Sequence, residues 1–194
     1  CFIIIGGNSH QTVVIGEQRW MAENLNTFNY ANGDDVTPVG DNLVWALNDT
    51  EGYSTYNNIG SYATIYGQLY NWYAVTDDRN LCIEGWHVPS YDELQILVDF
   101  VAGDGGALKE EGYDHWSVPN SGATNESGFS ARPGGYRNAN GHFADLGLST
   151  FFWTTSENSS IGRGLTQSLH YNLSEILEHE REKQQGFSVR CIQD

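Results

Sequence analysis

The 194-residue sequence is short of positive charge and of methionine, and it contains no long apolar run. Nine Lys and Arg residues stand against 25 Asp and Glu residues, which gives a formal net charge of −16. This balance argues against nucleic acids and anionic membrane surfaces as partners, because proteins bind both through a positively charged surface patch. No stretch reaches the length of a membrane span, and no charged segment leads into a short apolar signal core. We therefore expect no membrane span, with any export signal removed or lying outside this chain.

Cysteine is also scarce, because the chain has only Cys1, Cys82 and Cys191. None of them has histidine or cysteine neighbours at the spacing of a zinc site, so we expect no metal cluster. Three pairings and free thiols remain open. We favour a Cys82–Cys191 disulfide, which would close a loop of roughly 110 residues and add several kcal/mol of stability. Such a bond indicates an oxidising compartment. A bacterial lipoprotein carries its lipid on an N-terminal cysteine, so an anchor at Cys1 or upstream is the alternative for that residue.

The residues that are abundant predict a single folded domain over residues 1–194. Hydrophobic residues make up 39% of the chain and aromatic residues 13%, while 22 glycines imply many turns. This composition excludes disorder and suffices for a sizeable core. The excess carboxylates are expected mainly to form a solvated surface. We expect no resident cofactor, with calcium as the alternative, since Asn125 and Glu126 offer hard oxygen ligands. The same two side chains would serve equally well to tie their loop to backbone amides.

The first half of the chain predicts one hairpin and two helices. Phe2–Ile5 and Gln11–Ile15 are rich in strand formers and flank a turn at residues 6–8. Residues 48–62 are polar and predict an irregular surface loop. A first helix is expected over residues 64–75, because four side chains there share one helical face: Tyr66, Leu69, Tyr70 and Tyr73.

The second helix has the clearer signal. Ser90 is followed three residues later by Glu93, the pattern of a capping box at a helix start. The buried face is expected to consist of Leu94, Leu97, Val98 and Val101, with Gly103 ending the helix.

The second half of the chain predicts short strands and turns. Residues 151–155 read as a central strand, and residues 187–192 as a closing strand with Phe187, Val189 and Cys191 on one face. Between them, residues 165–172 and 175–182 alternate weakly and predict an exposed hairpin. Two helices within an otherwise irregular β protein indicate the α+β class.

Nine sequence segments, in this order, resemble the Fibrobacter succinogenes major paralogous domain family. They are Thr12-Val-Val-Ile-Gly16, Trp20-Met-Ala-Glu-Asn-Leu25, Tyr66-Gly-Gln-Leu-Tyr-Asn-Trp-Tyr-Ala74, Cys82-Ile-Glu-Gly-Trp-His-Val-Pro-Ser90, Leu108-Lys-Glu110, Gly122-Ala-Thr-Asn-Glu-Ser-Gly-Phe129, Pro133-Gly-Gly-Tyr-Arg137, Trp153 and Gly186-Phe-Ser-Val-Arg-Cys191. The resemblance covers nearly the whole chain.

The resemblance implies a C-type-lectin-like fold, with two helices packed on short twisted antiparallel sheets and extensive ordered loops. It also implies a secreted or surface-anchored bacterial protein. The fold is shared with formylglycine-generating enzymes, whose oxidases use two cysteines near the C-terminal part of the site. Here only Cys191 lies in that part, and copper–thiolate chemistry needs free thiolates. We therefore expect no enzyme.

The segment between Trp153 and Gly186 departs from the Tyr- and Asn-rich sequence that is usual in the family. A fixed scaffold with a rewritten surface suits a recognition module, although drift of an exposed surface would give the same pattern. We therefore expect non-catalytic binding of an extracellular protein or glycan. The alternatives are an assembly role in a larger surface protein or fimbria, and an enzyme with a cryptic site. The expected contact residues are Trp45, Tyr56, Trp153, Arg163, Gln167, His170, Asn172, Glu175, Glu178 and Glu180.

Overall fold

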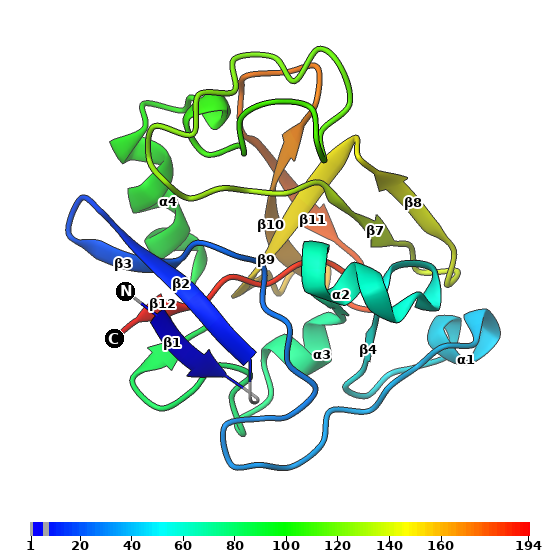
Figure 1. Ribbon diagram of the computed structural model, residues 1–194. Coiled ribbons are helices and arrows are strands. Elements are labelled where there is room, and N and C mark those ends of the chain that lie inside the picture. Colours follow the sequence, from blue (N-terminus) through cyan, green and yellow to red (C-terminus); the bar gives the residue numbers. More distant parts are fainter. Residues whose placement is uncertain (1, 6–7) are drawn as a thin grey trace.

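The first and last strands of the chain lie in the same sheet, as Figure 1 shows. The computed structural model describes residues 2–5 and 8–194. Its elements in chain order are β1 (Phe2–Ile5), β2 (Asn8–Ile15), β3 (Gln18–Met21), α1 (Asn42–Ala46), β4 (Tyr53–Ser54), η1 (Tyr56–Asn58), α2 (Gly60–Tyr66), β5 (Leu69–Tyr70), α3 (Trp72–Val75), β6 (Trp86–His87), α4 (Tyr91–Phe100), η2 (Gly105–Ala107), β7 (Gly134–Arg137), β8 (Phe143–Leu146), β9 (Ser149–Asn158), β10 (Arg163–His170), β11 (Leu177–Arg181) and β12 (Ile192–Gln193).

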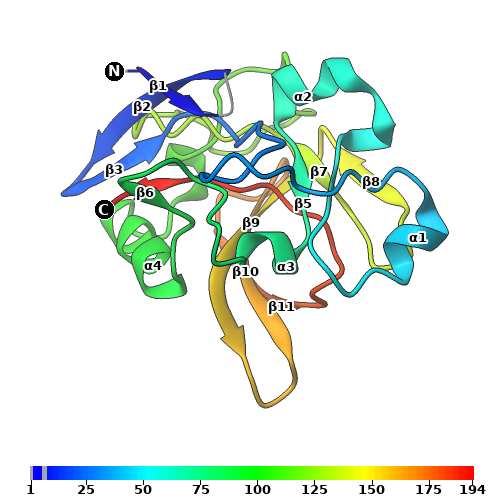
Figure 2. The same cartoon turned by 90° about the horizontal axis from the view of Figure 1, so that it is seen from below.

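Two five-stranded sheets form the frame. One has the order β1-β2-β3-β12-β6, and the other has the order β11-β10-β9-β7-β8, with only β7 and β9 parallel. The strand expected at residues 151–155 is part of β9, and its central place in the second sheet confirms the prediction. In Figure 2 the far ends of β9 and β10 project as a hairpin beyond the body of the molecule.

The buried interior consists of two apolar clusters, and the C-terminal segment contributes side chains to both. Phe187, Val189 and Cys191 point into one cluster together with Trp153. Ile192 belongs to the other cluster, which α4 covers. Alternation along an extended segment sends neighbouring side chains to opposite sides, and this explains why residues 187–191 serve the first cluster at every second position. The one-face prediction is confirmed.

The closing strand is shorter than predicted. Only Ile192 and Gln193 form regular ladder pairs, in β12. The residues before them are extended and join other segments through single bridges, from Phe187 to Tyr70 and from Ser188 to Phe152. One chain cannot pair continuously with two differently placed neighbours, so the ladder is interrupted.

The N-terminal hairpin is confirmed, with β1 and β2 antiparallel and Ile5 opposite Asn8. Strand β2 begins at Asn8, earlier than expected. The predicted turn residues Gly6 and Gly7 lie outside the described residues, as does Cys1.

The single helix predicted over residues 64–75 is wrong, because the segment forms α2, β5 and α3. Gly67 ends α2 with φ +77, and a Cβ there would lie 2.7 Å from the Cβ of Asn24. Tyr70 then exchanges backbone hydrogen bonds with Phe187, which holds β5 extended. Asn71 restarts the helix, because its Oδ1 accepts from the backbone N–H of Ala74 at 3.0 Å.

Residues 48–62 are more ordered than the loop predicted for them. They contain β4, η1 and the start of α2, and Ser54 and Tyr56 are buried. A further short helix, α1, was not predicted. Its cap is Asp41, whose Oδ1 accepts from the backbone N–H groups of Leu43 and Val44.

Helix α4 follows its prediction closely. Ser90 caps it and Glu93 completes a capping box. Leu94 and Leu97 are buried, while Val98 and Val101 at the margin are half-buried. The hairpin predicted from residues 165–172 and 175–182 is also present, as antiparallel β10 and β11. It is not exposed throughout, because residues 166–169 of β10 are buried. The protein is therefore an α+β protein, with four α-helices among the described residues in place of the two expected.

Candidate functional site

The expected recognition residues divide into an exposed group and a buried group. Five side chains are exposed on β10, β11 and the turn between them: Arg163, Asn172, Glu175, Glu178 and Glu180. His170, at the end of β10, is half-buried. Because β11 is the last strand of its sheet, these acidic side chains lie at an open sheet edge.

The aromatic residues expected to contact a ligand belong to the interior, and this part of the prediction is wrong. Trp153 is 0% exposed and donates its indole N–H to the carbonyl of Tyr70 at 2.8 Å. Trp45 is 1% exposed, and the guanidinium carbon of Arg137 lies over its ring, 4.3 Å from the ring centre. Tyr56 is also buried and packs near Phe143. None of these rings is presented to a ligand at the surface.

Gln167 is the fourth correction. It is 3% exposed, because its side of β10 faces α4, where its amide reaches Gln95 at 3.5 Å. The neighbouring positions on the outer strand remain open to solvent. Glu178 lies directly opposite Gln167 across the β10–β11 ladder.

A shallow hollow of about 340 Å³ lies on this side of the hairpin. It is lined by Tyr91, Leu165, Glu178, His179 and Glu180. A hydrogen bond with the Glu178 carboxylate raises the pKa of Tyr91 to about 12, so its hydroxyl stays protonated at neutral pH. The hollow thus offers carboxylate acceptors beside a phenol.

The other side of the same strands carries two histidines that share one hydroxyl. Ser168 Oγ lies 3.0 Å from His170 Nε2 and 2.9 Å from His179 Nε2. Burial lowers the pKa of both imidazoles, that of His179 to about 4, so both are neutral at pH 7. The hydroxyl donates to one ring and accepts from the other. Ser168 is fully buried, which keeps it from acting as an open nucleophile.

Asn125, one of the two residues named as a weak calcium candidate, makes local hydrogen bonds, while Glu126 is exposed. Asn125 accepts from the backbone N–H of Ser130 at 2.8 Å and donates to the Ser130 hydroxyl at 2.8 Å. These bonds tie the loop together in the way that the sequence offered as the alternative. Within the described part of the chain, no three His, Cys, Asp or Glu side chains are placed to hold a metal ion.

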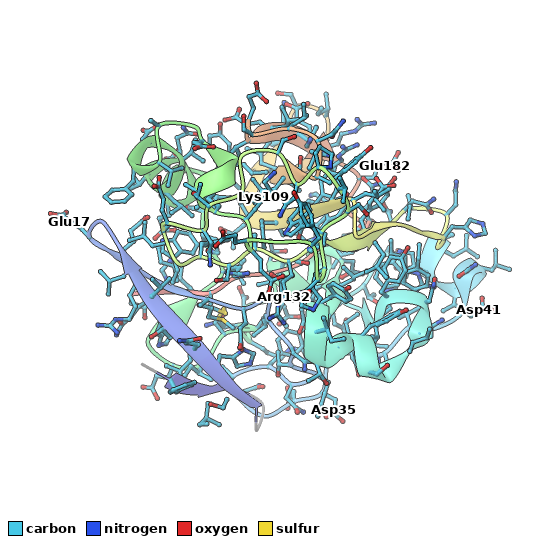
Figure 3. All side chains as sticks on the ribbon, turned by 45° about the horizontal axis from the view of Figure 1, so that its top comes forward. Glu17, Asp35, Asp41, Lys109, Arg132 and Glu182 are labelled. Atoms are coloured by element: carbon cyan, nitrogen blue, oxygen red, sulfur yellow. A yellow bond between two sulfur atoms is a disulfide. The ribbon has the colours of Figure 1, made fainter. Side chains whose placement is uncertain are left out.

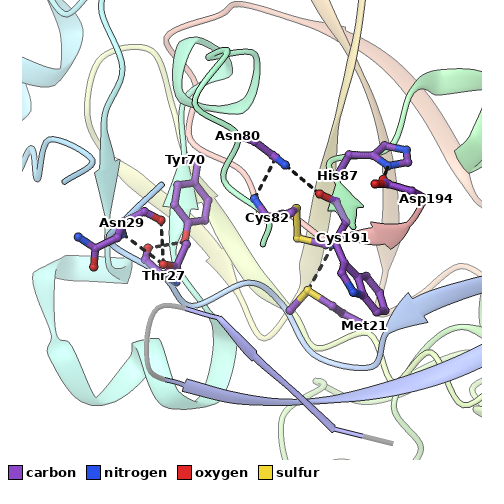
Figure 4. Close-up of a disulfide and its surroundings, with 10 residues drawn as sticks. Met21, Thr27, Asn29, Tyr70, Asn80, Cys82, His87, Cys191 and Asp194 are labelled. Carbon is purple, nitrogen blue, oxygen red and sulfur yellow. Dashed lines mark hydrogen bonds and ion pairs between the residues drawn. A yellow bond between two sulfur atoms is a disulfide. The ribbon is translucent and has the colours of Figure 1, made fainter. Parts of the chain in front are cut away.

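The predicted disulfide is present. Cys82 and Cys191 are bonded, 109 residues apart in sequence, and both are buried (Figure 4). Around the bond, Asn80 accepts from the backbone N–H of Cys82 at 3.0 Å. The bond fastens the C-terminal segment to the loop that precedes β6.

Three buried cations hold loops through backbone carbonyls, and sequence reasoning missed all of them. Lys109 Nζ donates to the carbonyls of Ser121, His170 and Leu173 at 2.7, 3.0 and 2.8 Å. Burial lowers the pKa of Lys109 to about 8. One ammonium group thereby fixes the turn that follows β10.

Arg137 and Arg190 act in the same way. Arg137 donates to the carbonyls of Gly141 at 2.8 Å and Gly40 at 3.0 Å, and so holds the loop before α1. Arg190 donates to the carbonyls of Met21 at 3.2 Å and Ser130 at 3.1 Å. One sequence feature could have indicated this role: Lys109, Arg137 and Arg190 are among few basic residues, and each lies in a segment that contains glycine or serine.

A polar cleft of about 300 Å³ was also missed by sequence reasoning. Its wall is formed by residues 9–11 of β2, residues 22–24 and Asn26 after β3, residues 63–65 of α2, Gly67 at the end of that helix, the loop residues Glu110, Ser130 and Arg132, and Arg190. Arg132 is labelled in Figure 3, between the ribbon of α2 and the loops above it.

Charges of both signs meet in this cleft. Arg132 Nε donates to Glu110 Oε1 at 2.8 Å, and Glu110 Oε2 lies 2.6 Å from His115 Nδ1. His10 is 2% exposed, and its Nδ1 lies 3.6 Å from the Glu23 carboxylate. Burial lowers the pKa of His10, so its ring is neutral at pH 7. The arrangement places an ion pair on one wall and a carboxylate beside a neutral imidazole on another.

The α+β fold, with its disulfide-tied C-terminal segment and ordered loops, agrees with a domain family that matches the sequence. The chain belongs to the Fibrobacter succinogenes major domain (Fib_succ_major) family, whose match covers residues 13–193. The comparisons with curated proteins and with solved structures gave no match. Among the described residues, no helix is both long enough and apolar enough to cross a membrane.

Proposed function

We propose that this domain is a non-catalytic, extracellular ligand-recognition module with a C-type-lectin-like scaffold, part of a secreted or surface-anchored bacterial protein. The observation that carries the proposal is the contrast within one sheet. Trp153 of β9 and Ser168 of β10 are fully buried, while Glu178 and Glu180 of the neighbouring outer strand are exposed. A rigid inner frame therefore supports a polar surface that is free to make contacts.

The outer strand β11 supplies directional groups for such contacts. Glu178 and Glu180 point to the same side of the sheet, because they are two residues apart on one strand. Tyr91 and Leu165 line the hollow beside them. Carboxylates accept hydrogen bonds from sugar hydroxyls and from cationic protein side chains. Asn172 and Glu175 extend the polar surface along the turn.

Location and fold rest on separate support. The Cys82–Cys191 disulfide supports an oxidising compartment, outside the cytoplasm. The return of the C-terminal strand to the N-terminal sheet and the extensive ordered loops support the lectin-like architecture. A lipid anchor, where one exists, would lie at Cys1 or upstream.

A glycan array, together with binding to purified extracellular proteins, tests the proposal. The variants Asn172→Ala and Glu178→Gln remove exposed contacts without touching the core. Glu84→Gln, an exposed change elsewhere, is the matched control. Binding that falls at least about tenfold in both variants and is unchanged in the control supports the proposal. Binding that is equal in all three proteins places the contact elsewhere and overturns it.

An assembly role is the second candidate, because α1 exposes apolar side chains. Leu43 is 68% exposed on this short helix, Leu47 directly after the helix is 74% exposed, and Val44 is exposed beside them. Exposed apolar clusters favour a fixed protein neighbour over a soluble glycan. Loss of cell-surface incorporation on changing Leu43 and Leu47 to Ser, with glycan binding absent throughout, would favour this role.

A further inference from the structure

The polar cleft between β2, α2 and the 110–132 loops lies away from the recognition surface proposed above. Several of its wall residues come from the segments by which the chain resembles its family: Ala22, Glu23, Asn24, Gly67, Glu110 and Arg190. Segments far apart in sequence thus converge on one enclosed space. The hairpin face, in contrast, lies outside those segments.

One buried side chain of the cleft makes no hydrogen bond, although it lies near a carboxylate. Both ring nitrogens of His10 are buried, and neither makes a hydrogen bond to any described group. A buried polar group without a partner costs roughly 1–3 kcal/mol, so such groups are rare in folded proteins and call for an explanation. A polar ligand in the cleft would supply the missing partner.

The cleft also has an inner positive side. Arg190 is 1% exposed, and the groups it bonds are all neutral: the amide oxygen of Asn24 and the carbonyls of Met21, Phe129 and Ser130. Its charge is therefore not compensated by a bonded carboxylate among the described residues. Burial lowers the pKa of Arg190 to about 9, although the negative charge of Glu23 opposes the shift.

Arg132 adds a second guanidinium, which is fixed in place. Its Nε is held by Glu110 and its Nη1 by the carbonyl of Ile65, at 2.8 and 3.2 Å. The side chain is 36% exposed and lines the cleft. Guanidinium groups pair well with carboxylates, and a fixed one loses little freedom on binding.

Glu23 gives the cleft a negative charge. Its carboxylate lies 3.6 Å from Nδ1 of the neutral His10 ring and is close enough to Arg190 to attract its charge. The side chain is 50% exposed, so the carboxylate remains open to a second cation. The cleft therefore suits a ligand that carries an anionic and a cationic group within a short distance.

We propose that this cleft binds a small zwitterion of the α-amino-acid class, with the ligand carboxylate toward Arg132 and Arg190 and the ligand ammonium toward Glu23. His10 lines the space between them. A volume of about 300 Å³ is at the small end for ligand sites, which suits one amino acid and excludes an oligosaccharide. The proposal is independent of binding at β10 and β11.

Calorimetric titration at pH 7 with each standard L-amino acid tests this assignment, followed by thermal unfolding with the best binder. Acetate and methylammonium, which each carry one of the two charges, serve as half-ligand probes. We expect saturable binding of at least one amino acid, a matching rise in Tm, and binding at least about tenfold weaker for each half-ligand.

Two variants assign the contacts. Glu23→Gln removes the negative wall at a half-exposed position, so the fold should be retained. It should weaken amino-acid binding at least about tenfold and leave acetate binding unchanged. Glu17→Gln, at the exposed β2–β3 turn seen at the edge of Figure 3, is the matched control and should bind like the parent protein.

Several outcomes would overturn the assignment. One is the absence of saturable heat and of any Tm rise with every amino acid up to about 10 mM, well above common affinities for small ligands. Others are acetate binding as tightly as the best amino acid, and Glu23→Gln binding as tightly as the parent. None of these results affects the outcome at the β10–β11 surface, because the two tests use different variants and probes.

Discussion

Removal of the Cys82–Cys191 disulfide should cost this domain much of its stability. The bond joins residues 109 positions apart, and both cysteines are fully buried. Cross-linking a loop of this length lowers the conformational entropy of the unfolded chain. In the loop-entropy treatment this raises the free energy of the unfolded state by about 4.8 kcal/mol at 25 °C. Domains are commonly stable by only about 5–15 kcal/mol, so the loss should be large.

Urea unfolding of the double variant Cys82→Ala/Cys191→Ala at pH 7 measures this loss. We expect a fall in unfolding free energy of about 3–5 kcal/mol. The single variant Cys82→Ala should lose nearly as much, because either change abolishes the same bond and the two effects are not additive. A double variant whose unfolding free energy falls by less than about 1 kcal/mol would refute the reasoning, since the disulfide would then add almost nothing to the stability that packing provides.

Three further predictions concern contacts elsewhere in the frame. Ser90→Ala, which removes the cap of α4, should lower the unfolding free energy by about 1 kcal/mol in urea. Lys109→Met leaves three carbonyls without their shared donor and should lower the unfolding free energy by roughly 3 kcal/mol in the same assay. The control Lys183→Met should show no such loss, because the buried ammonium group of Lys109 is the cause. Burial opposes a charge on His87, but its hydrogen bonds with Asp194 and Glu93 outweigh burial and raise its pKa above 6.5. The stability from these bonds should be fully present below the pKa of His87 in the unfolded chain, and it should fade as pH rises through the higher pKa of His87 in the folded protein. Urea midpoints of His87→Gln and of the parent protein, measured from about pH 5 to 9, would test this.

The sequence predicts this structure best where neighbouring residues decide the outcome. Ser90 and Glu93 are three positions apart, and the capping box that they form needs nothing from the rest of the chain. The antiparallel pairing of β10 with β11 is equally local. The confirmed Cys82–Cys191 pairing is favoured on other grounds, because these two cysteines lie in segments expected to be ordered whereas Cys1 is terminal.

Prediction failed where distant segments decide. The periodicity around Tyr66 and Tyr70 fits a helix, but the backbone of Phe187 pairs with Tyr70 and keeps it extended. Trp45 and Trp153 were assigned to a binding surface, since an aromatic ring suits a ligand contact and a core equally well. Only the packed neighbours distinguish the two roles, and in both cases they bury the ring.

The polar cleft shows the same limit for a candidate site. His10 lies on β2 and Glu23 follows β3, which pairs with β2, so their proximity follows from this hairpin. Arg132 and Arg190 reach the same space from loops and from the C-terminal segment. No spacing rule links these positions, so the residues that line the cleft become visible only in three dimensions.

Holding loops with internal cations has a consequence for the outside of the protein. Lys109, Arg137 and Arg190 are withdrawn from solvent, whereas no Asp or Glu is buried among the described residues. The solvent therefore meets 25 acidic groups against only six basic ones, a stronger imbalance than the formal charge implies. Counterions screen this field within about 8 Å at physiological ionic strength. In dilute salt, copies of the domain should repel one another, and encounters with cationic molecules should be accelerated.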